Sequence, residues 1–226
     1  MNILHVLSQF EVTGAETLAA TIADRQVAAG HRVTIVSDTF HTATKAEVLS
    51  VPIGKRDLLQ RLRNIASLRI LINERSIDVV HAHSRAASWV SFFATRYSIV
   101  PLVSTIHGKQ HVHFSSRHSK IYGDKLIAVC ESLKDHLCTD LGCNADSISV
   151  IRNGIDLHLW HPDQSAPAAG SGKKILSLVG RLSGPKGEVA RRIVEDVFPV
   201  IHAAHPDTEL RIVGGMKDSN RLDEAV

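Results

Sequence analysis

Two cations stand close together in the stretch GRLSGPKG, which spans residues 180–187 and directly follows the apolar run ILSLV. Arg181 comes immediately after this predicted strand, and Lys186 begins the helix that we expect next. A guanidinium offers phosphate oxygens a planar fork, an ammonium offers them a mobile charge, and the first amides of a helix attract anions. The spacing therefore indicates an anion site. The alternative is an exposed loop with two unrelated cations.

A glycine that could approach a ligand occurs much earlier, in the segment EVTGAETLAA. Gly14 lies between the first predicted strand and the first predicted helix, where backbone amides can face an anion. The alternative is a turn glycine that opens the helix, with Glu16 adding favourable charge near the helix N-terminus. The dinucleotide fingerprint GxGxxG is missing after this strand.

Histidines, of which the chain has fourteen, gather after two further predicted strands. HAH (His81–His83) closes one strand, and HGKQHVH (His107–His113) follows the next. Neighbouring parallel strands would place both groups at the carboxyl edge of a sheet, where α/β proteins bind ligands. An HxH pair with a further histidine suits Zn²⁺, but no carboxylate stands beside either group, and we predict no metal site. The competing interpretation is that His81 and His83 are strand-end residues hydrogen-bonded to the backbone.

The scaffold that must position these residues is visible as short apolar runs that alternate with helical segments. This pattern predicts βαβ units and an α/β fold, with a parallel sheet covered by helices on both faces. The predicted strands are Ile3–Leu7, Val33–Val36, Val79–His81, Leu102–Ile106, Leu126–Val129 and Ile148–Ile151, and the predicted helices are Glu16–Ala29, Asp57–Asn73, Ala86–Thr95 and Glu131–Leu141.

The alternation is interrupted by HPDQSAPAAGSG (His161–Gly172), whose Pro, Ala, Ser and Gly indicate a linker. A new strand, helix and strand follow from Lys174. One such unit cannot close a core alone. We therefore predict a first domain over residues 1–160, a linker over 161–172 and an incomplete second domain over 173–226.

Composition excludes several classes of protein. Apolar residues make up 44% and charged residues 22% of the chain, as in soluble globular proteins. The net charge of +3 is too small to indicate nucleic-acid binding. The N-terminus lacks a basic region, and no apolar run approaches the roughly 18 residues of a membrane span. We expect a cytoplasmic protein whose three cysteines are reduced.

One helical segment, Lys55–Ile72, is basic and carries an apolar stripe at Leu58, Leu62, Ile65 and Leu68. Such a helix could touch an anionic membrane surface. Docking of the stripe on the sheet, with the arginines in solvent, explains the same pattern, and we favour that interpretation.

Taken in order, these motifs resemble those of the family 4 retaining glycosyltransferases, which have the GT-B fold. The matching stretches are TGAE (Thr13–Glu16), IDVVHAHS (Ile77–Ser84), STIHG (Ser104–Gly108), DKLIAVCESLKDHL (Asp124–Leu137), VIRNGID (Val150–Asp156) and GRLSGPKG (Gly180–Gly187). They run along essentially the whole chain, and the last two are the most specific.

The resemblance implies two Rossmann-like domains with a nucleotide-sugar between them. Residues 1–160 would form the acceptor-side domain, and residues from 173 onward would begin the donor-side domain. By the same resemblance, Arg181 and Lys186 would bind the donor diphosphate, Gly14 would meet it with backbone amides, and His107 would be the catalytic candidate near the sugar. Stabilising the departing phosphate is then the main electrostatic task.

The implied activity is that of a hexosyltransferase-type enzyme that retains the anomeric configuration. It would use a UDP- or GDP-sugar and no cofactor, and it would act on a saccharide or lipid-linked acceptor in cell-envelope or polysaccharide synthesis. The sequence contains no DxD, which agrees with metal-independent transfer. The acceptor-side candidates are Glu16, Ser84, Lys109 and Arg117, and peripheral contact with the cytoplasmic membrane is compatible with such an acceptor.

One departure from the family concerns the E-x7-E motif that holds the donor sugar. No two glutamates after Gly187 are eight residues apart, so we expect these 226 residues alone to transfer sugar very slowly or not at all. The alternatives are a non-catalytic module that binds a sugar or an anion, one half of a split enzyme, a metal hydrolase, and a GT-B sugar-nucleotide epimerase. An epimerase would need carboxylate acid–base groups, for which Glu16 and Glu131 are the candidates.

Overall fold

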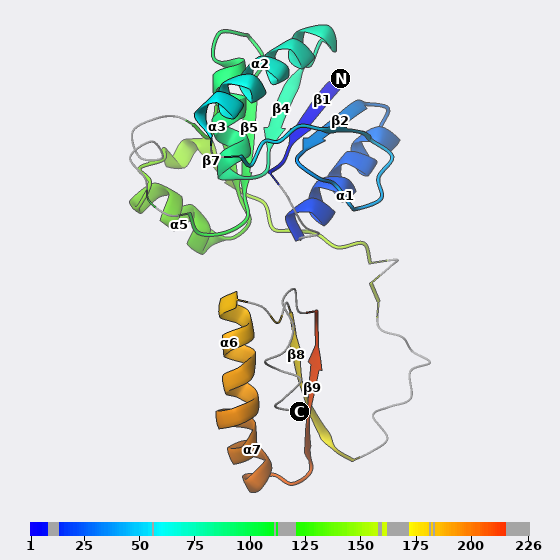
Figure 1. The fold of residues 1–226 in the computed structure, drawn as a ribbon, viewed down its shortest axis with the longest axis vertical. Coiled ribbons are helices and arrows are strands. Elements are labelled where there is room, and N and C mark those ends of the chain that lie inside the picture. Colours follow the sequence, from blue (N-terminus) through cyan, green and yellow to red (C-terminus); the bar gives the residue numbers. More distant parts are fainter. Residues whose placement is uncertain are drawn as a thin grey trace. The chain divides into compact units, whose positions relative to one another are not determined.

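The computed structural model describes residues 1–8, 14–55, 57–110, 112, 121–157, 160–161, 172–180, 182 and 184–215 (Figure 1). The chain divides into two compact units, Met1–Ile155 (unit 1) and Asp156–Val226 (unit 2). The α/β class expected from the sequence is confirmed, and all three cysteines are free.

Unit 1 is built on a seven-stranded sheet in the order β3-β2-β1-β4-β5-β6-β7, with every neighbouring pair parallel. The six predicted strands are present. The sheet also has an edge strand, β3, that the sequence pattern did not indicate, because its four residues EVLS carry little apolar signal. The strands are β1 Asn2–Val6, β2 Arg32–Ser37, β3 Glu47–Ser50, β4 Val79–Ala82, β5 Leu102–Ile106, β6 Lys125–Ala128 and β7 Ile148–Val150.

The described residues of unit 1 form four helices between these strands: α1 Gly14–Ala28, α2 Leu58–Glu74, α3 Arg85–Thr95 and α5 Glu131–Thr139, with a short 3₁₀ turn at Ala145–Ser147. Two of them begin at side-chain caps. The Asp57 carboxylate accepts a hydrogen bond from the backbone N–H of Gln60, and the Ser84 hydroxyl accepts one from Ala87. Such caps satisfy N–H groups that have no partner inside the helix.

The two faces of the sheet bury different residues, because successive side chains of a strand point to opposite sides. Leu4 and Val6 of β1 belong to an apolar cluster with buried residues of α2 and α3. Ile3 belongs to another cluster, with Ala19 and Ala23 of α1. His5 has the same parity as Ile3 and therefore lies on the face that α1 covers.

Helix α2 differs from its sequence-based interpretation. Leu68 and Ile72 are buried and Ile65 packs against the core, but Leu58 and Leu62 are 67% and 54% exposed. The expectation that the whole stripe docks is therefore wrong for its first two leucines. Only the later turns of α2 reach the core cluster.

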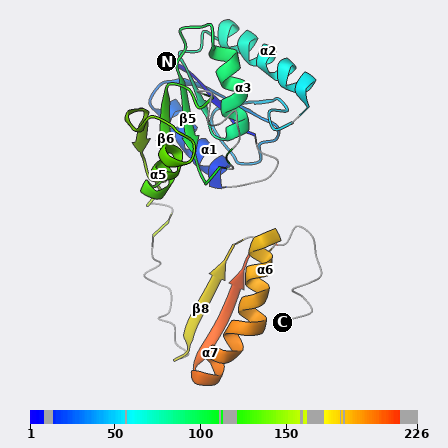
Figure 2. The same ribbon diagram turned by 90° about the vertical axis from the view of Figure 1, so that its left-hand side faces the viewer.

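Unit 2 contains two parallel strands, β8 Lys174–Val179 and β9 Thr208–Val213, joined by α6 Gly184–Arg192, a π-helical turn Ile193–Val197 and α7 Phe198–Ala204. Figure 2 shows these three helical segments as one rod beside the strands. The π-helical turn has a local cause. Pro199 lacks the N–H that would continue the α-helical ladder, and Phe198 N–H instead donates five residues back, to Ile193 O.

Candidate functional site

The carboxyl edge of the unit 1 sheet brings together residues that lie far apart in the sequence. His83 follows β4 and His107 follows β5, and their ring centroids lie 5.8 Å apart with the ring planes only 17° from parallel. Ser8, which follows β1, lies 2.6 Å from the hydroxyl of Ser84. His83 of the first predicted histidine group and His107 of the second thus meet, because β4 and β5 are adjacent parallel strands, whereas His111 and His113 lie outside the described residues.

A further histidine, His5, belongs to this assembly and was not predicted. It pairs with His81 in the register of β1 and β4, and the centroids of these two rings lie 5.1 Å apart. The ring of His5 is also 5.1 Å from that of His83, and His81 is 4.1 Å from His83. We call His5, His81, His83 and His107 the histidine column. The available sequence signal was one polar residue inside the apolar run ILHVL.

The histidine column is held by side-chain hydrogen bonds. His5 Nδ1 lies 2.8 Å from His83 Nε2, and His5 Nε2 lies 2.7 Å from Gln26 Oε1 on α1. His81 Nε2 lies 2.7 Å from the hydroxyl of Thr105. Among the described residues, the ring contacts of His81 and His83 are thus made to side chains, whereas their predicted backbone bonding is seen in the main chain. Strand pairing already engages the backbone here, as in the bond from His83 N–H to Val6 O.

Burial keeps the histidine column neutral. His5 and His83 are 0% and 2% exposed, and loss of hydration lowers the pKa of both rings. Burial, together with His5 and His107, lowers the pKa of His81 to about 3. Burial also lowers the pKa of His107. All four imidazoles therefore carry bare ring nitrogens at neutral pH.

Three of these rings have the arrangement of metal ligands. One nitrogen from each of His5, His81 and His83 lies within 4.8 Å of the others. Neutral imidazole nitrogens suit zinc. Three neutral rings, however, supply no negative charge to offset that of a buried divalent metal ion. The contact between His5 Nδ1 and His83 Nε2 also has the length of a hydrogen bond, which fits two bonded rings without a metal ion between them.

The predicted acceptor-side residues occupy three kinds of environment. The buried Glu16 carboxylate accepts three hydrogen bonds of 2.8 Å at Oε1, from the backbone of His41 and from the backbone and hydroxyl of Thr42. Glu16 therefore anchors the segment that follows β2. Ser84 is half-buried and caps α3, whereas Lys109 is exposed.

Gly14 begins α1, and a Cβ placed there would meet no atom of the described residues within 4 Å. The described residues therefore leave space beside the backbone at this position. Arg117 and Arg181, two of the predicted site residues, lie outside the described residues.

Lys186 lies in the first turn of α6, is exposed and forms no ion pair with the residues that the structure describes. Gly187 follows, and a Cβ there would stand 2.5 Å from the carbonyl oxygen of Leu182. Leu182 is in turn held by a hydrogen bond from its N–H to Gly215 O. The helix start and the preceding loop therefore pack too closely for any side chain at residue 187.

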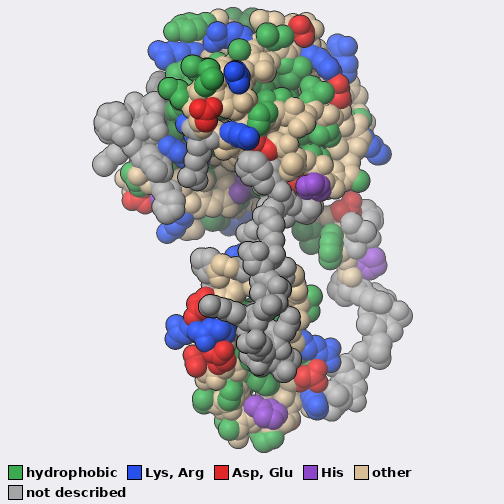
Figure 3. Space-filling model, viewed as in Figure 1, with side chains coloured by type: hydrophobic (Ala, Val, Ile, Leu, Met, Phe, Trp, Pro, Cys, Tyr) green, Lys and Arg blue, Asp and Glu red, His purple; other side chains and the backbone are tan. Residues whose placement is uncertain are grey.

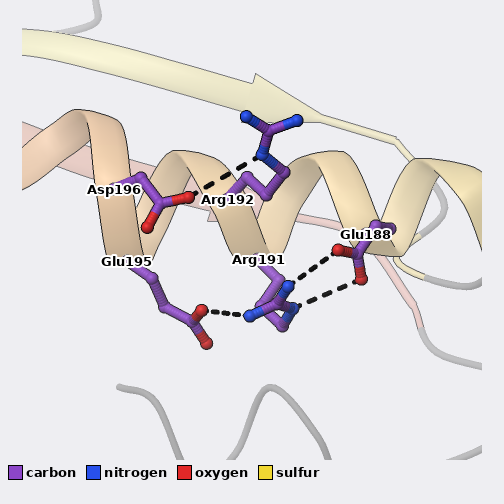
Figure 4. A network of polar contacts seen from close by, with 5 residues as sticks. All are labelled: Glu188, Arg191, Arg192, Glu195 and Asp196. Atoms are coloured by element: carbon purple, nitrogen blue, oxygen red, sulfur yellow. Dashed lines mark hydrogen bonds and ion pairs between the residues drawn. The ribbon is translucent and has the colours of Figure 1, made fainter.

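The arginines farther along this helix are already paired. Figure 4 shows Arg191 between Glu188 and Glu195, and Arg192 beside Asp196. The closest Arg191–Glu188 contact is 2.7 Å, and Arg192 Nε lies 3.7 Å from Asp196. Lys186, at the N-terminal end of α6, therefore differs from these arginines in having no carboxylate partner among the described residues.

The part of the chain that the structure describes contains no helix long and apolar enough to cross a bilayer. Figure 3 shows hydrophobic side chains interspersed with Lys and Arg over the top of unit 1, where α2 lies. Leu58, Leu59 and Leu62 of α2 are all more than half exposed.

Comparison with known proteins agrees with this architecture. The model of Glycosyltransferase Family 4 matches residues 12–159. A glycogen synthase of Mycobacterium tuberculosis is 31% identical in an alignment 166 positions long, and the alignment covers 66% of this chain and 38% of that enzyme. The chain thus spans well under half the length of this relative.

Solved structures share the fold at low sequence identity. A glycosyltransferase from Rickettsia africae has a TM-score of 0.74 at 20% identity, over 95% of this chain and 68% of that one. The Anabaena protein HepE in complex with UDP-glucose has a TM-score of 0.70 at 20% identity, over 99% of this chain and 63% of that one. A UDP-N-acetylglucosamine 2-epimerase is more distant, with a TM-score of 0.57 at 15% identity over 93% of this chain and 62% of that one.

The match to the family model covers more than half of the chain and includes the strand ends that carry His83 and His107. The parallel sheet of unit 1 is that of GT-B glycosyltransferases. The chain belongs to Glycosyltransferase Family 4.

Proposed function

We propose that this chain is part of a glycosyltransferase that moves a hexosyl group from a nucleotide-sugar to an acceptor, with retention and without a metal ion. The observation that carries the proposal is the match to Glycosyltransferase Family 4 over residues 12–159, which contain the histidine-lined carboxyl edge. The UDP-glucose bound to the structurally similar Anabaena protein supports a donor of the UDP-sugar type.

In unit 2, the proposed task is to bind the donor diphosphate. Lys186 supplies a cation that forms no ion pair with the described residues, in the first turn of α6, where backbone N–H groups also favour an anion. The close approach of Gly187 to Leu182 holds Leu182, the neighbour of Arg181 in the sequence, against the helix start. Arg181 and Lys186 would together neutralise the charge that develops on the leaving diphosphate.

In unit 1, the proposed task is to hold the reacting sugar and the acceptor. The open backbone at Gly14 would give amides to the diphosphate. His107 would lie beside the sugar, and burial keeps its imidazole neutral by lowering its pKa. A neutral ring does not repel a sugar carbon that becomes cation-like in the transition state. Ser84, Lys109, Arg117 and Glu16 remain the candidates on the acceptor side.

The proposed domains follow from the same assignment. Residues 1–160 would form the acceptor-side domain, and residues from 173 onward would begin the donor-side domain.

The exposed leucines of α2, flanked by Lys55 and Arg63, support peripheral contact with an anionic cytoplasmic membrane, as a lipid-linked acceptor would require. Synthesis of a cell-envelope component or polysaccharide in the cytoplasm is the corresponding proposed role.

The donor assignment is tested by measuring UDP-glucose binding to the 226-residue chain by calorimetry. Substituting Lys186→Ala is expected to weaken binding roughly tenfold or more, the effect of losing a charged hydrogen bond. Arg192→Ala is the matched control, because Arg192 is exposed on the same rod and pairs with Asp196. Equal weakening by both variants, or no binding by the unaltered chain, would contradict the proposal.

Catalysis is measured separately, with a panel of nucleotide-sugars and acceptors. We expect turnover by this chain to be very slow or absent, and rapid transfer would show that expectation to be wrong. The epimerase neighbour favours one alternative, which the same samples test. Epimer formation from UDP-N-acetylglucosamine without any acceptor would favour it over a transferase.

A further inference from the structure

A line of hydrogen bonds runs from helix α1 into the carboxyl edge of unit 1. Gln26 Oε1 lies 2.7 Å from His5 Nε2, and His5 Nδ1 lies 2.8 Å from His83 Nε2. His5 and His83 are buried, so water does not compete for these contacts. The other nitrogen of His83, Nδ1, is buried and has no hydrogen-bond partner among the described residues.

The proton count sets the direction of every bond in this line. A neutral imidazole has one N–H and one bare nitrogen. Because Gln26 Oε1 can only accept, His5 donates from Nε2 and its Nδ1 is bare. That bare nitrogen accepts a hydrogen bond from His83 Nε2–H, which leaves no proton on His83 Nδ1.

The bare nitrogen of His83 lies in a place where a ligand is expected. The carboxyl edge of a parallel sheet is the usual binding edge of α/β folds. The rings of His83 and His107 stack with centroids 5.8 Å apart, and His107 Nε2 is also buried without a described partner. A buried nitrogen without a partner is unfavourable, so a ligand that donates a hydrogen bond there is stabilised.

We propose that Gln26 and His5 are positioning residues that hold His83 in its Nε2–H tautomer, so that its bare Nδ1 accepts a hydrogen bond from a sugar hydroxyl. The contact with a sugar rests on the proposed function, whereas the tautomer does not.

The line of hydrogen bonds ends at an uncharged amide, Gln26, and this choice of residue affects the charge on His5. A carboxylate at residue 26 would set the same tautomer but would also favour a charged imidazolium at His5. His5 lies on a sheet face whose neighbours include the apolar Ile3 and Ile35, where an added charge is strongly unfavourable. The amide therefore orders the protons without bringing charge into the core.

The tautomers are read directly by long-range ¹H–¹⁵N NMR of the intact chain with ¹⁵N-labelled histidine, because protonated and bare ring nitrogens resonate far apart. His5 and His83 are both expected to carry the proton on Nε2. A proton on Nδ1 of His83 overturns the proposal. One zinc ion per chain, retained against a chelator, also overturns it, because the metal would occupy these lone pairs.

Two substitutions at Gln26 separate positioning from simple packing. Gln26→Leu removes the acceptor, and His5 and His83 are expected to lose their single tautomer. Gln26→Glu restores an acceptor, and the Nε2–H pattern is expected to return at alkaline pH, where His5 stays neutral beside the carboxylate. Gln60→Leu on α2 is the matched control and should leave these resonances unchanged. If Gln26→Leu retains the wild-type tautomers, or if Gln26→Glu abolishes them in a folded chain at alkaline pH, the proposal fails.

Adding UDP-glucose to the labelled chain tests the hydroxyl contact. A shift of the His83 Nδ1 resonance on binding supports it, and binding that leaves this resonance in place overturns it. Complete absence of binding contradicts the proposed function, while the tautomers still decide the role of Gln26 and His5.

Discussion

Acidification should destabilise unit 1 because its histidine column is neutral when folded. Burial places the folded pKa values of His5, His81 and His83 below the ordinary value of 6.5. Below about pH 6.5 the unfolded chain binds protons that the folded chain does not. The stabilisation is therefore complete above pH 6.5 and is lost progressively as the pH falls toward the folded pKa values.

The magnitude can be worked out for His81, whose pKa is lowered from 6.5 to about 3. At pH 5 its ring is charged in the unfolded chain and neutral in the folded one. Each pH unit below the unfolded pKa lowers the free energy of unfolding by about 1.4 kcal/mol, so His81 alone removes about 2 kcal/mol by pH 5. His5 and His83 act in the same direction. A domain of this kind is stable by only about 5–15 kcal/mol.

The assay is urea unfolding at pH 7.5, 6.5, 5.5 and 5, followed by the fluorescence of Trp89, which packs against the core of unit 1. Trp160→Phe removes the other tryptophan. In His81→Gln, the loss of unfolding free energy between pH 7.5 and pH 5 should be smaller by about 2 kcal/mol. His205→Gln, an exposed histidine of unit 2, is the control. A wild-type free energy that does not change with pH, or the same pH dependence in His81→Gln, would refute the reasoning.

Three further changes have expected outcomes. Glu16→Ala leaves the donors of residues 41–42 without their acceptor and should lower the free energy of unfolding by about 3 kcal/mol, measured in urea; no loss would contradict an anchoring role. Gly187→Ala places a Cβ 2.5 Å from Leu182 O and should weaken UDP-glucose binding in calorimetry, and unchanged affinity would show that the loop tolerates the shift. Leu62→Asp should reduce sedimentation with anionic vesicles, with neutral vesicles as the control; equal sedimentation of both chains would exclude α2 as the membrane contact.

Local sequence predicts much of this fold because each strand and helix is encoded by its own residues. The alternation of apolar runs and helical segments located six strands and four helices of unit 1. It missed β3 because a short edge strand buries little. It also misassigned the start of α2, since periodicity shows which side of a helix is apolar but not how far along its length the core extends.

The sequence by itself determined that His81, His83 and His107 lie at strand ends, because parallel strands align those ends at one edge. Only the tertiary structure decided that β1 lies between β2 and β4, which places His5 beside His81 and His83. The same is true of Gln26, which reaches His5 only because α1 packs on that face of the sheet. Strand order and helix docking depend on contacts between residues distant in the chain, and no local pattern of residue types records them.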